Sequence, residues 1–145
     1  MKTLTVPNDI LFGLVSRLVA EGEAVSFMTK GSSMLPFIRG DRDSVRIIKR
    51  DTYNVNDIVL TRLRSGQYIL HRIIDIAEEH VTLQGDGNIR GTESCLKEDI
   101  IGVVIAIITP DGKEHAPSSG VFWRKIKPLR RYLLAIYRRL PKCLQ

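Results

Sequence analysis

The spacing of apolar positions changes along the chain, and the first change comes at Gly22. Before it, residues 8 to 21 repeat apolar side chains with a helical period, and Asn8 or Asp9 is placed to act as N-cap. The apolar positions of this stretch are Leu11, Leu14, Val15, Leu18 and Val19. The pattern predicts an amphipathic helix that packs on the body of the domain and ends at Gly22. Contact with a membrane surface is the alternative interpretation.

After Gly22 the apolar period moves towards two, which is typical of strands. Short runs rich in β-branched and aromatic residues are separated by Gly, Asn, Asp or Ser. We expect strands at residues 24–29, 44–48, 57–62, 68–74, 80–84 and 100–108. Ser65-Gly66 predicts a hairpin that pairs the third and fourth of these strands antiparallel. Further turns are expected at 85–88 and 110–112, so the fold is predicted to be mainly β.

Composition places the chain among ordinary globular proteins. Its 145 residues suit one domain, and 43% hydrophobic with 26% charged residues excludes a disordered or coiled-coil class. We expect three segments: an N-terminal helix over 1–23, a β domain over 24–112, and a connection with a basic amphipathic helix over 113–145. Cys95 and Cys143 are too few for a disulfide framework and lack the spacing of a metal site, which favours a reducing compartment.

Positive charge is concentrated in the last segment. The net charge is +6, yet residues 121–145 hold eight basic residues and no acidic one, so the rest of the chain is slightly acidic. Apolar and aromatic residues interleave with these charges, which favours a helix lying on an anionic membrane surface. A cationic helix that only packs on the domain is the alternative, and nucleic acid is not the expected partner. No run is long enough to span a membrane and no signal peptide is evident, so a cytoplasmic or peripheral location is expected.

Candidate chemistry begins with the stretch from Lys30 to Asp43, KGSSMLPFIRGDRD. Gly31 permits backbone angles closed to other residues, and Pro36 fixes its own φ, so the chain around Ser33 is expected to be bent and stiff. Such a bend can present Ser33 as a nucleophile. An ordinary loop between strands is the alternative interpretation.

A serine nucleophile needs a base, and His71 lies in the otherwise apolar strand at 68–74. A histidine in such a strand can also be a satisfied core residue. Asp86 and Glu93 follow and could orient the imidazole as the acid of a triad does. No lysine occurs between Lys49 and Lys97, which excludes a Ser-Lys dyad that draws its base from the central strands.

Five short sequence motifs occur in an order that resembles the type I signal peptidase superfamily, the S24 and S26 serine peptidases. This superfamily also includes the self-cleaving SOS repressors. The motifs are GSSMLPFIRGD, NDIVLTR, ILHRII, LQGDGN and DIIGVVIAI, and the resemblance covers about residues 24 to 108. The His-Arg pair resembles the endoplasmic-reticulum and archaeal branch, whose base is histidine. The resemblance implies coiled antiparallel β-sheets, with the N-terminal helix and the C-terminal basic helix outside them.

The same resemblance implies the roles of individual residues. It makes Ser33 the nucleophile and His71 the base, with Asp86 as the first choice of acid and Glu93 as the second. Ser32, Ser33 and Met34 occupy the positions that contact the substrate and the oxyanion. Gly31 stands where signal peptidases carry a serine that helps to form the oxyanion hole, so backbone amides such as that of Ser33 would form it.

The implied activity is that of a serine endopeptidase that cuts an extended peptide or preprotein after small residues, with no cofactor or metal. One alternative is a non-catalytic basic β module that binds an anionic membrane or nucleic acid. Another is a self-cleaving repressor-like protein, although the segment ahead of the first strand is too short for a helix-turn-helix domain.

Overall fold

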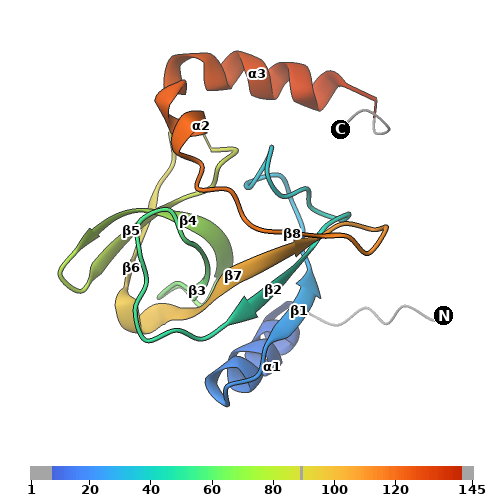
Figure 1. The fold of residues 1–145 in the computed structure, drawn as a ribbon. Helices are drawn as coiled ribbons and strands as arrows, with labels where there is room; N and C mark the ends of the chain where they lie inside the picture. Colours follow the sequence, from blue (N-terminus) through green and yellow to red (C-terminus); the bar gives the residue numbers. More distant parts are fainter. Residues whose placement is uncertain (1–7, 89, 142–145) are drawn as a thin grey trace.

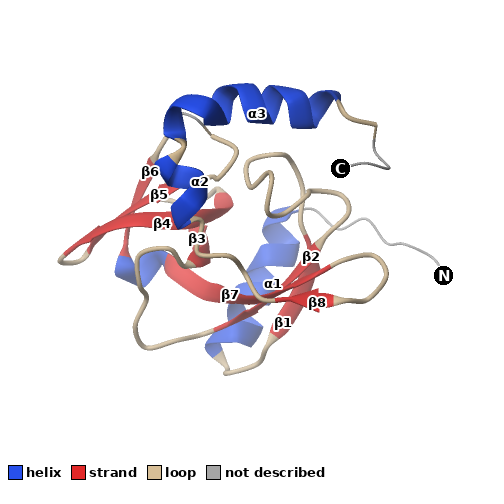
Figure 2. Cartoon of the chain, turned by 45° about the horizontal axis from the view of Figure 1, so that its top comes forward, coloured by secondary structure: helices blue, strands red, loops and turns tan. Residues whose placement is uncertain are grey.

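The fold is built on one curled antiparallel sheet. The computed structural model describes residues 8–88 and 90–141, and within them eight strands form a half-barrel in the order β1-β2-β7-β3-β4-β5-β6, with β8 beside β7. The helix α1 (Asn8–Ala20) lies at one end of the half-barrel, and the helices α2 and α3 cross the other end (Figures 1 and 2). The prediction of a mainly β fold is confirmed.

The strands follow the sequence pattern closely. Their bounds are β1 (Val25–Met28), β2 (Ser44–Ile48), β3 (Ile58–Arg62), β4 (Tyr68–Ala77), β5 (His80–Gln84), β6 (Glu93–Leu96), β7 (Ile100–Ile108) and β8 (Glu114–His115), and a 3₁₀ turn (Lys97–Asp99) precedes β7. All six predicted strands are present. The two short strands β6 and β8 were not predicted, because neither has enough alternating apolar positions to reveal it.

Pairing in the sheet explains its curl. The hairpin of β3 and β4 is antiparallel as predicted, with Ile58 opposite Arg72 and Arg62 opposite Tyr68. The apolar strand β7 lies between β2 and β3 and is buried along most of its length. The register shifts by one residue at Arg46/Ile47 in β2 and at Leu60/Thr61 in β3. Such bulges increase strand twist, which lets one sheet coil.

The helix α1 ends as predicted but faces the sheet differently. Gly22 has φ +93°, and the N–H of Glu23 donates to the carbonyl of Leu18, a Schellman ending. The predicted face included Leu14, which is exposed, whereas Phe12 packs on the core instead. The Phe12 ring meets the rings of Phe27 and Tyr68 at centroid distances of 5.3 Å, and this aromatic contact sets the rotation of the helix.

The C-terminal segment forms two helices rather than one, α2 (Val121–Lys125) and α3 (Lys127–Arg139). The break is at Ile126, because Pro128 in the first turn of α3 has no N–H to continue the helical hydrogen bonds from α2. Trp123 and Leu134 pack on Leu35 and fasten this segment to the loop between β1 and β2. Across the described ranges, every helix is too short or too polar to cross a bilayer.

Candidate active site

Ser33 lies in the loop between β1 and β2, and the base of this loop is closed by hydrogen bonds. The N–H of Thr29 donates to the carbonyl of Asp43 at 3.0 Å, and the N–H of Asp41 donates to the carbonyl of Thr29 at 2.8 Å. The buried carboxylate of Asp43 accepts from the N–H of Arg39 and from Nε of Arg42, each at 2.9 Å. The stiff bend expected from the sequence is therefore held by its two ends.

Two glycines, Gly31 and Gly40, allow the two halves of this loop to pack backbone against backbone. Gly31 has φ +80°, in the region that only glycine adopts readily. A Cβ atom on Gly40 would lie 2.0 Å from the carbonyl oxygen of Gly31, so the two backbones are in direct contact. The loop therefore narrows just before Ser33.

A second turn, Gly85-Asp86-Gly87, supports the serine from the other side. The N–H of Gly87 donates to the carbonyl of Ser33 at 2.7 Å. A Cβ atom on Gly85 would lie 2.4 Å from the same carbonyl oxygen, and one on Gly87 would lie 2.5 Å from that of Ser32. The two glycines are needed here for close approach, because any side chain would displace the turn at Ser32 and Ser33, which we call the serine turn.

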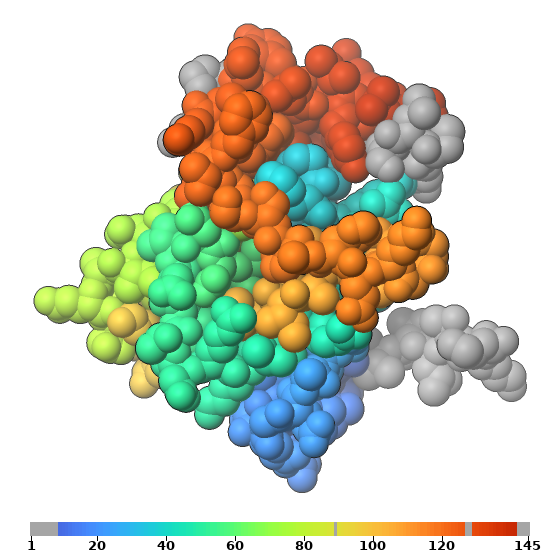
Figure 3. Space-filling model, viewed as in Figure 1, coloured from blue at the N-terminus to red at the C-terminus, as the bar shows by residue number. Residues whose placement is uncertain are grey.

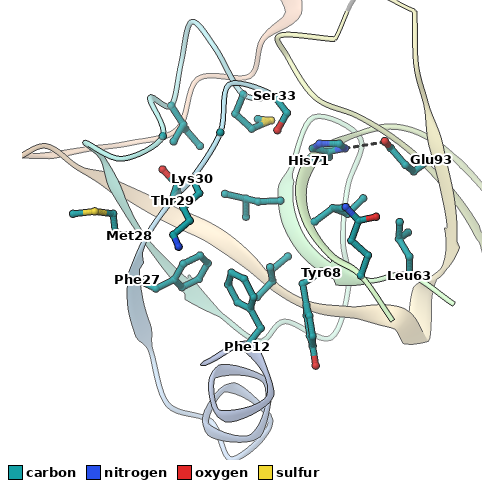
Figure 4. Close-up of a pocket in the computed structure, with 18 of the residues that line it drawn as sticks. Phe12, Phe27, Met28, Thr29, Lys30, Ser33, Leu63, Tyr68, His71 and Glu93 are labelled. Atoms are coloured by element: carbon teal, nitrogen blue, oxygen red, sulfur yellow. Dashed lines mark hydrogen bonds and ion pairs between the residues drawn. The ribbon is translucent and has the colours of Figure 1, made fainter. Parts of the chain in front are cut away.

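Ser33 and His71 line one pocket of about 660 Å³ (Figure 4). The rest of its wall is mostly apolar and comes largely from α1, β1, β3, β4 and the loop between β1 and β2. The main apolar contributors are Phe12, Phe27, Leu60, Tyr68 and Leu70. The pocket can therefore hold uncharged side chains next to a hydroxyl and an imidazole.

The imidazole of His71 is oriented by Glu93. His71 is buried in β4, opposite Val59 of β3, and its Nδ1 lies 2.8 Å from Oε2 of Glu93 at the start of β6. Figure 4 shows the ring between the two side chains, with Glu93 on one side and Ser33 on the other. Among the described residues, the hydroxyl of Ser33 has no hydrogen-bond partner. In a site without substrate, hydrogen bonds between nucleophile and base are often long and tighten on binding.

Asp86, the first choice of acid, does not contact the imidazole. Its carboxylate accepts two hydrogen bonds of 2.8 Å from Nε and Nη2 of Arg72, and both side chains are buried. The geometry thus reverses the order expected from the sequence, since the second choice, Glu93, is the carboxylate at His71. Alternation along β4 explains the difference, because neighbouring side chains point to opposite faces of a strand.

Arg72 is a central residue that sequence reasoning passed over. Its Nη1 also donates to the carbonyls of Asn56 at 2.8 Å and Ser118 at 2.6 Å, and its guanidinium lies 5.4 Å from the ring centroid of Phe37. Trp123 Nε1 donates to the carbonyl of Asp86 at 2.8 Å. A signal was present, because an arginine inside an apolar strand requires a buried carboxylate partner.

The oxyanion residues implied by the resemblance lie in different surroundings. In the described part of the chain the N–H of Ser33 has no hydrogen-bond acceptor, so it is available to a developing oxyanion. Ser32 is exposed, whereas Met34 is buried and its Sδ lies 3.5 Å from the N–H of Asp86. Met34 therefore joins the serine turn to the Gly85-Asp86-Gly87 turn.

Comparison of the chain with models of known protein families and with curated protein sequences finds no match. The geometry of its own residues therefore carries the interpretation. No cluster of three or more metal-ligating side chains occurs among the residues that the structure describes. What the site presents is a hydroxyl, an imidazole held by a carboxylate, and a free backbone N–H around an apolar pocket.

Proposed function

We propose that the protein is a serine endopeptidase of the signal-peptidase-like type. Ser33 attacks the peptide carbonyl, His71 takes its proton and returns it to the leaving amine, and Glu93 holds the imidazole. The N–H of Ser33 stabilises the oxyanion of the tetrahedral intermediate. The acyl group on Ser33 is then released by water that is activated by the same imidazole.

The observation that carries the proposal is the 2.8 Å contact of Glu93 with His71 in the pocket that Ser33 lines. A buried histidine kept only for packing would also need an acceptor for its ring N–H, but it would not need its other side to face an open pocket that a serine lines. The carboxylate fixes the ring orientation and stabilises the imidazolium that forms during attack. The contact therefore supports His71 as the base, with its other ring nitrogen, Nε2, taking the proton of Ser33.

The free edge of β1 supports an extended substrate. β1 is the last strand on its side of the described sheet, and it runs directly through Thr29 and Lys30 into the serine turn. A peptide that pairs with this edge as an added strand would pass along the pocket and reach Ser33. By the resemblance, small residues would precede the cut.

Lys30 is the other base to consider, because it also lines the pocket. It is exposed, and a lysine needs burial to lose its proton near neutral pH. His71, buried and bonded to Glu93, is the better base on these grounds. Lys30→Ala is thus a useful control.

The test is labelling of the full chain with a serine-directed fluorophosphonate, read by peptide mass spectrometry. We expect an adduct on Ser33 that is lost in Ser33→Ala and in His71→Ala but kept in Ser32→Ala and Lys30→Ala. Cleavage of a peptide library by the wild-type protein, absent in Ser33→Ala, would identify the substrate. Labelling that survives unchanged in His71→Ala would contradict the proposed mechanism.

A further inference from the structure

The outer face of α3 is apolar and exposed. Leu129, Tyr132, Leu133 and Ile136 follow the spacing i, i+3, i+4, i+7, so they share one side of the helix. Their exposed fractions lie between 41% and 64%, and Phe122 of α2 is 75% exposed. Large apolar side chains gathered on a surface in this way mark an interaction site more often than single exposed ones do.

The fold does not need this face, because α3 packs on the domain through a different one. Arg130, Leu134 and Tyr137 follow the spacing i, i+4, i+7, and Arg130 and Leu134 are almost completely buried. Leu134 packs with Trp123 and Leu35 in a small core of its own. The outer face is therefore left for a partner.

The apolar surface continues from α3 to the loop between β1 and β2, which contains Ser33. A groove of about 270 Å³ is lined by residues of α2 and α3, among them Leu133 and Ile136, together with Leu140 and Pro36. Figure 3 shows α2 and α3 resting on the loop that contains Pro36. The surface therefore extends to within three residues of Ser33 in the sequence.

Positive charge borders this apolar face. Arg139 is exposed and follows Ile136 by three residues and Tyr132 by seven, so it lies at the edge of the face, and Lys125 is exposed three residues after Phe122. Arg131 and Arg138 are exposed on the side of α3 that is turned away from the face. No acidic residue occurs from position 121 onwards. A second copy of this face would bring like charges together, and a nucleic acid backbone would leave the leucine and isoleucine side chains uncovered. An anionic bilayer accepts both parts of the surface, since apolar side chains enter the headgroup boundary and cations meet lipid phosphates.

We propose that the outer face of α3, together with Phe122 of α2, docks on the surface of an anionic phospholipid bilayer. The helix lies in the plane of the membrane with Leu129, Leu133 and Ile136 inserted. Lys125 and Arg139 extend their charged ends to the headgroups beside it. The proposal rests on exposure and charge, and it holds whether or not Ser33 is a nucleophile.

The test is co-sedimentation of the full chain with phosphatidylcholine vesicles, with and without phosphatidylglycerol. We expect binding that needs the anionic lipid. The double variant Leu129→Ser/Ile136→Ser should weaken it by roughly tenfold or more, because two apolar side chains no longer insert. Lys125→Glu/Arg139→Glu should also lose binding to anionic vesicles. All four residues are exposed, so the variants should keep the wild-type circular dichroism spectrum.

The matched control is Ile10→Ser/Leu14→Ser, which removes two exposed apolar side chains from α1 at the other end of the half-barrel. We expect this variant to bind vesicles as the wild type does. Equal loss in the control, or no vesicle binding by the wild type, would overturn the proposal. So would a dimer in sedimentation velocity that Leu129→Ser/Ile136→Ser dissociates, or an affinity for duplex DNA or RNA that exceeds the affinity for vesicles.

Discussion

Nδ1 of His71 lies 2.8 Å from Oε2 of Glu93, and this contact joins β4 to β6 across the end of β5. The two strands are not neighbours in the sheet, so the curl of the half-barrel brings the carboxylate to the ring. The imidazole is thereby fixed from a part of the chain that differs from the one holding Ser33. The placement of Ser33 relative to His71 thus depends on contacts across the whole sheet.

Replacing the carboxylate at His71 should reduce activity without unfolding the protein. We expect Glu93→Gln to lower kcat by on the order of 10³, because the amide neither stabilises the imidazolium nor fixes the same tautomer. The measurement is steady-state cleavage of a peptide found in the library screen. Glu98→Gln, at an exposed position close by, is the control and should be unaffected. Full activity in Glu93→Gln would show that the carboxylate does not assist the base.

Replacing Asp86 should instead reduce stability. Asp86→Asn leaves the guanidinium of Arg72 buried without its counter-charge, which typically costs about 3–5 kcal/mol. Urea unfolding followed by Trp123 fluorescence measures the change, with Asp75→Asn on the exposed side of β4 as control. A variant at Asp86 that remained fully stable but inactive would mean that Asp86, not Glu93, serves His71.

A methyl group on Gly87 should displace the serine turn. The new Cβ would lie 2.5 Å from the carbonyl oxygen of Ser32, closer than any real contact. We expect Gly87→Ala to slow fluorophosphonate labelling of Ser33 and to lower stability by about 1–3 kcal/mol, the usual cost of overpacking. Gly91→Ala is the matched control, because a Cβ there meets nothing within 4 Å. Equal labelling of the two variants would contradict the proposed packing of the two turns.

Cys95 should make stability depend on pH in the alkaline range. Burial raises the pKa of its thiol from its usual value near 9 to about 11. The folded state therefore keeps a proton that the unfolded chain releases, so this contribution to stability is present below pH 9 and lost as the pH rises towards 11. Urea unfolding of the wild type and of Cys95→Val at pH 7 and pH 10.5 separates the contribution of the Cys95 thiol from that of other titrating side chains. We expect the wild type to lose more stability than the variant, and equal losses would contradict the raised pKa.

Local patterns predicted most of the fold. Apolar alternation located six strands, and Ser65-Gly66 located the hairpin of β3 and β4, because these signals involve residues close in sequence. β6 was missed because its four residues become a strand only by pairing with β5. The exposure of Leu14 was missed for a similar reason, since the rotation of α1 is set by rings of β1 and β4.

The candidate site was predicted less completely. The sequence identified Ser33 and His71 and left two acids open, because spacing alone cannot say which carboxylate faces which side of β4. Arg72 determines which carboxylate contacts His71. On one face of β4 Arg72 binds the carboxylate of Asp86, and on the other face Glu93 contacts His71. A rule that a buried arginine must find its carboxylate first would have predicted the contact of Glu93 with His71.

The bond from Trp123 to the carbonyl of Asp86 has a consequence for the growing chain. The serine turn rests on the Gly85-Asp86-Gly87 turn and on Trp123 through Leu35, yet Trp123 is made long after Ser33. During synthesis Ser33 is therefore present before one of the side chains that support its turn. A nascent chain would carry Ser33 without its full structural support until the segment that holds Trp123 has left the ribosome.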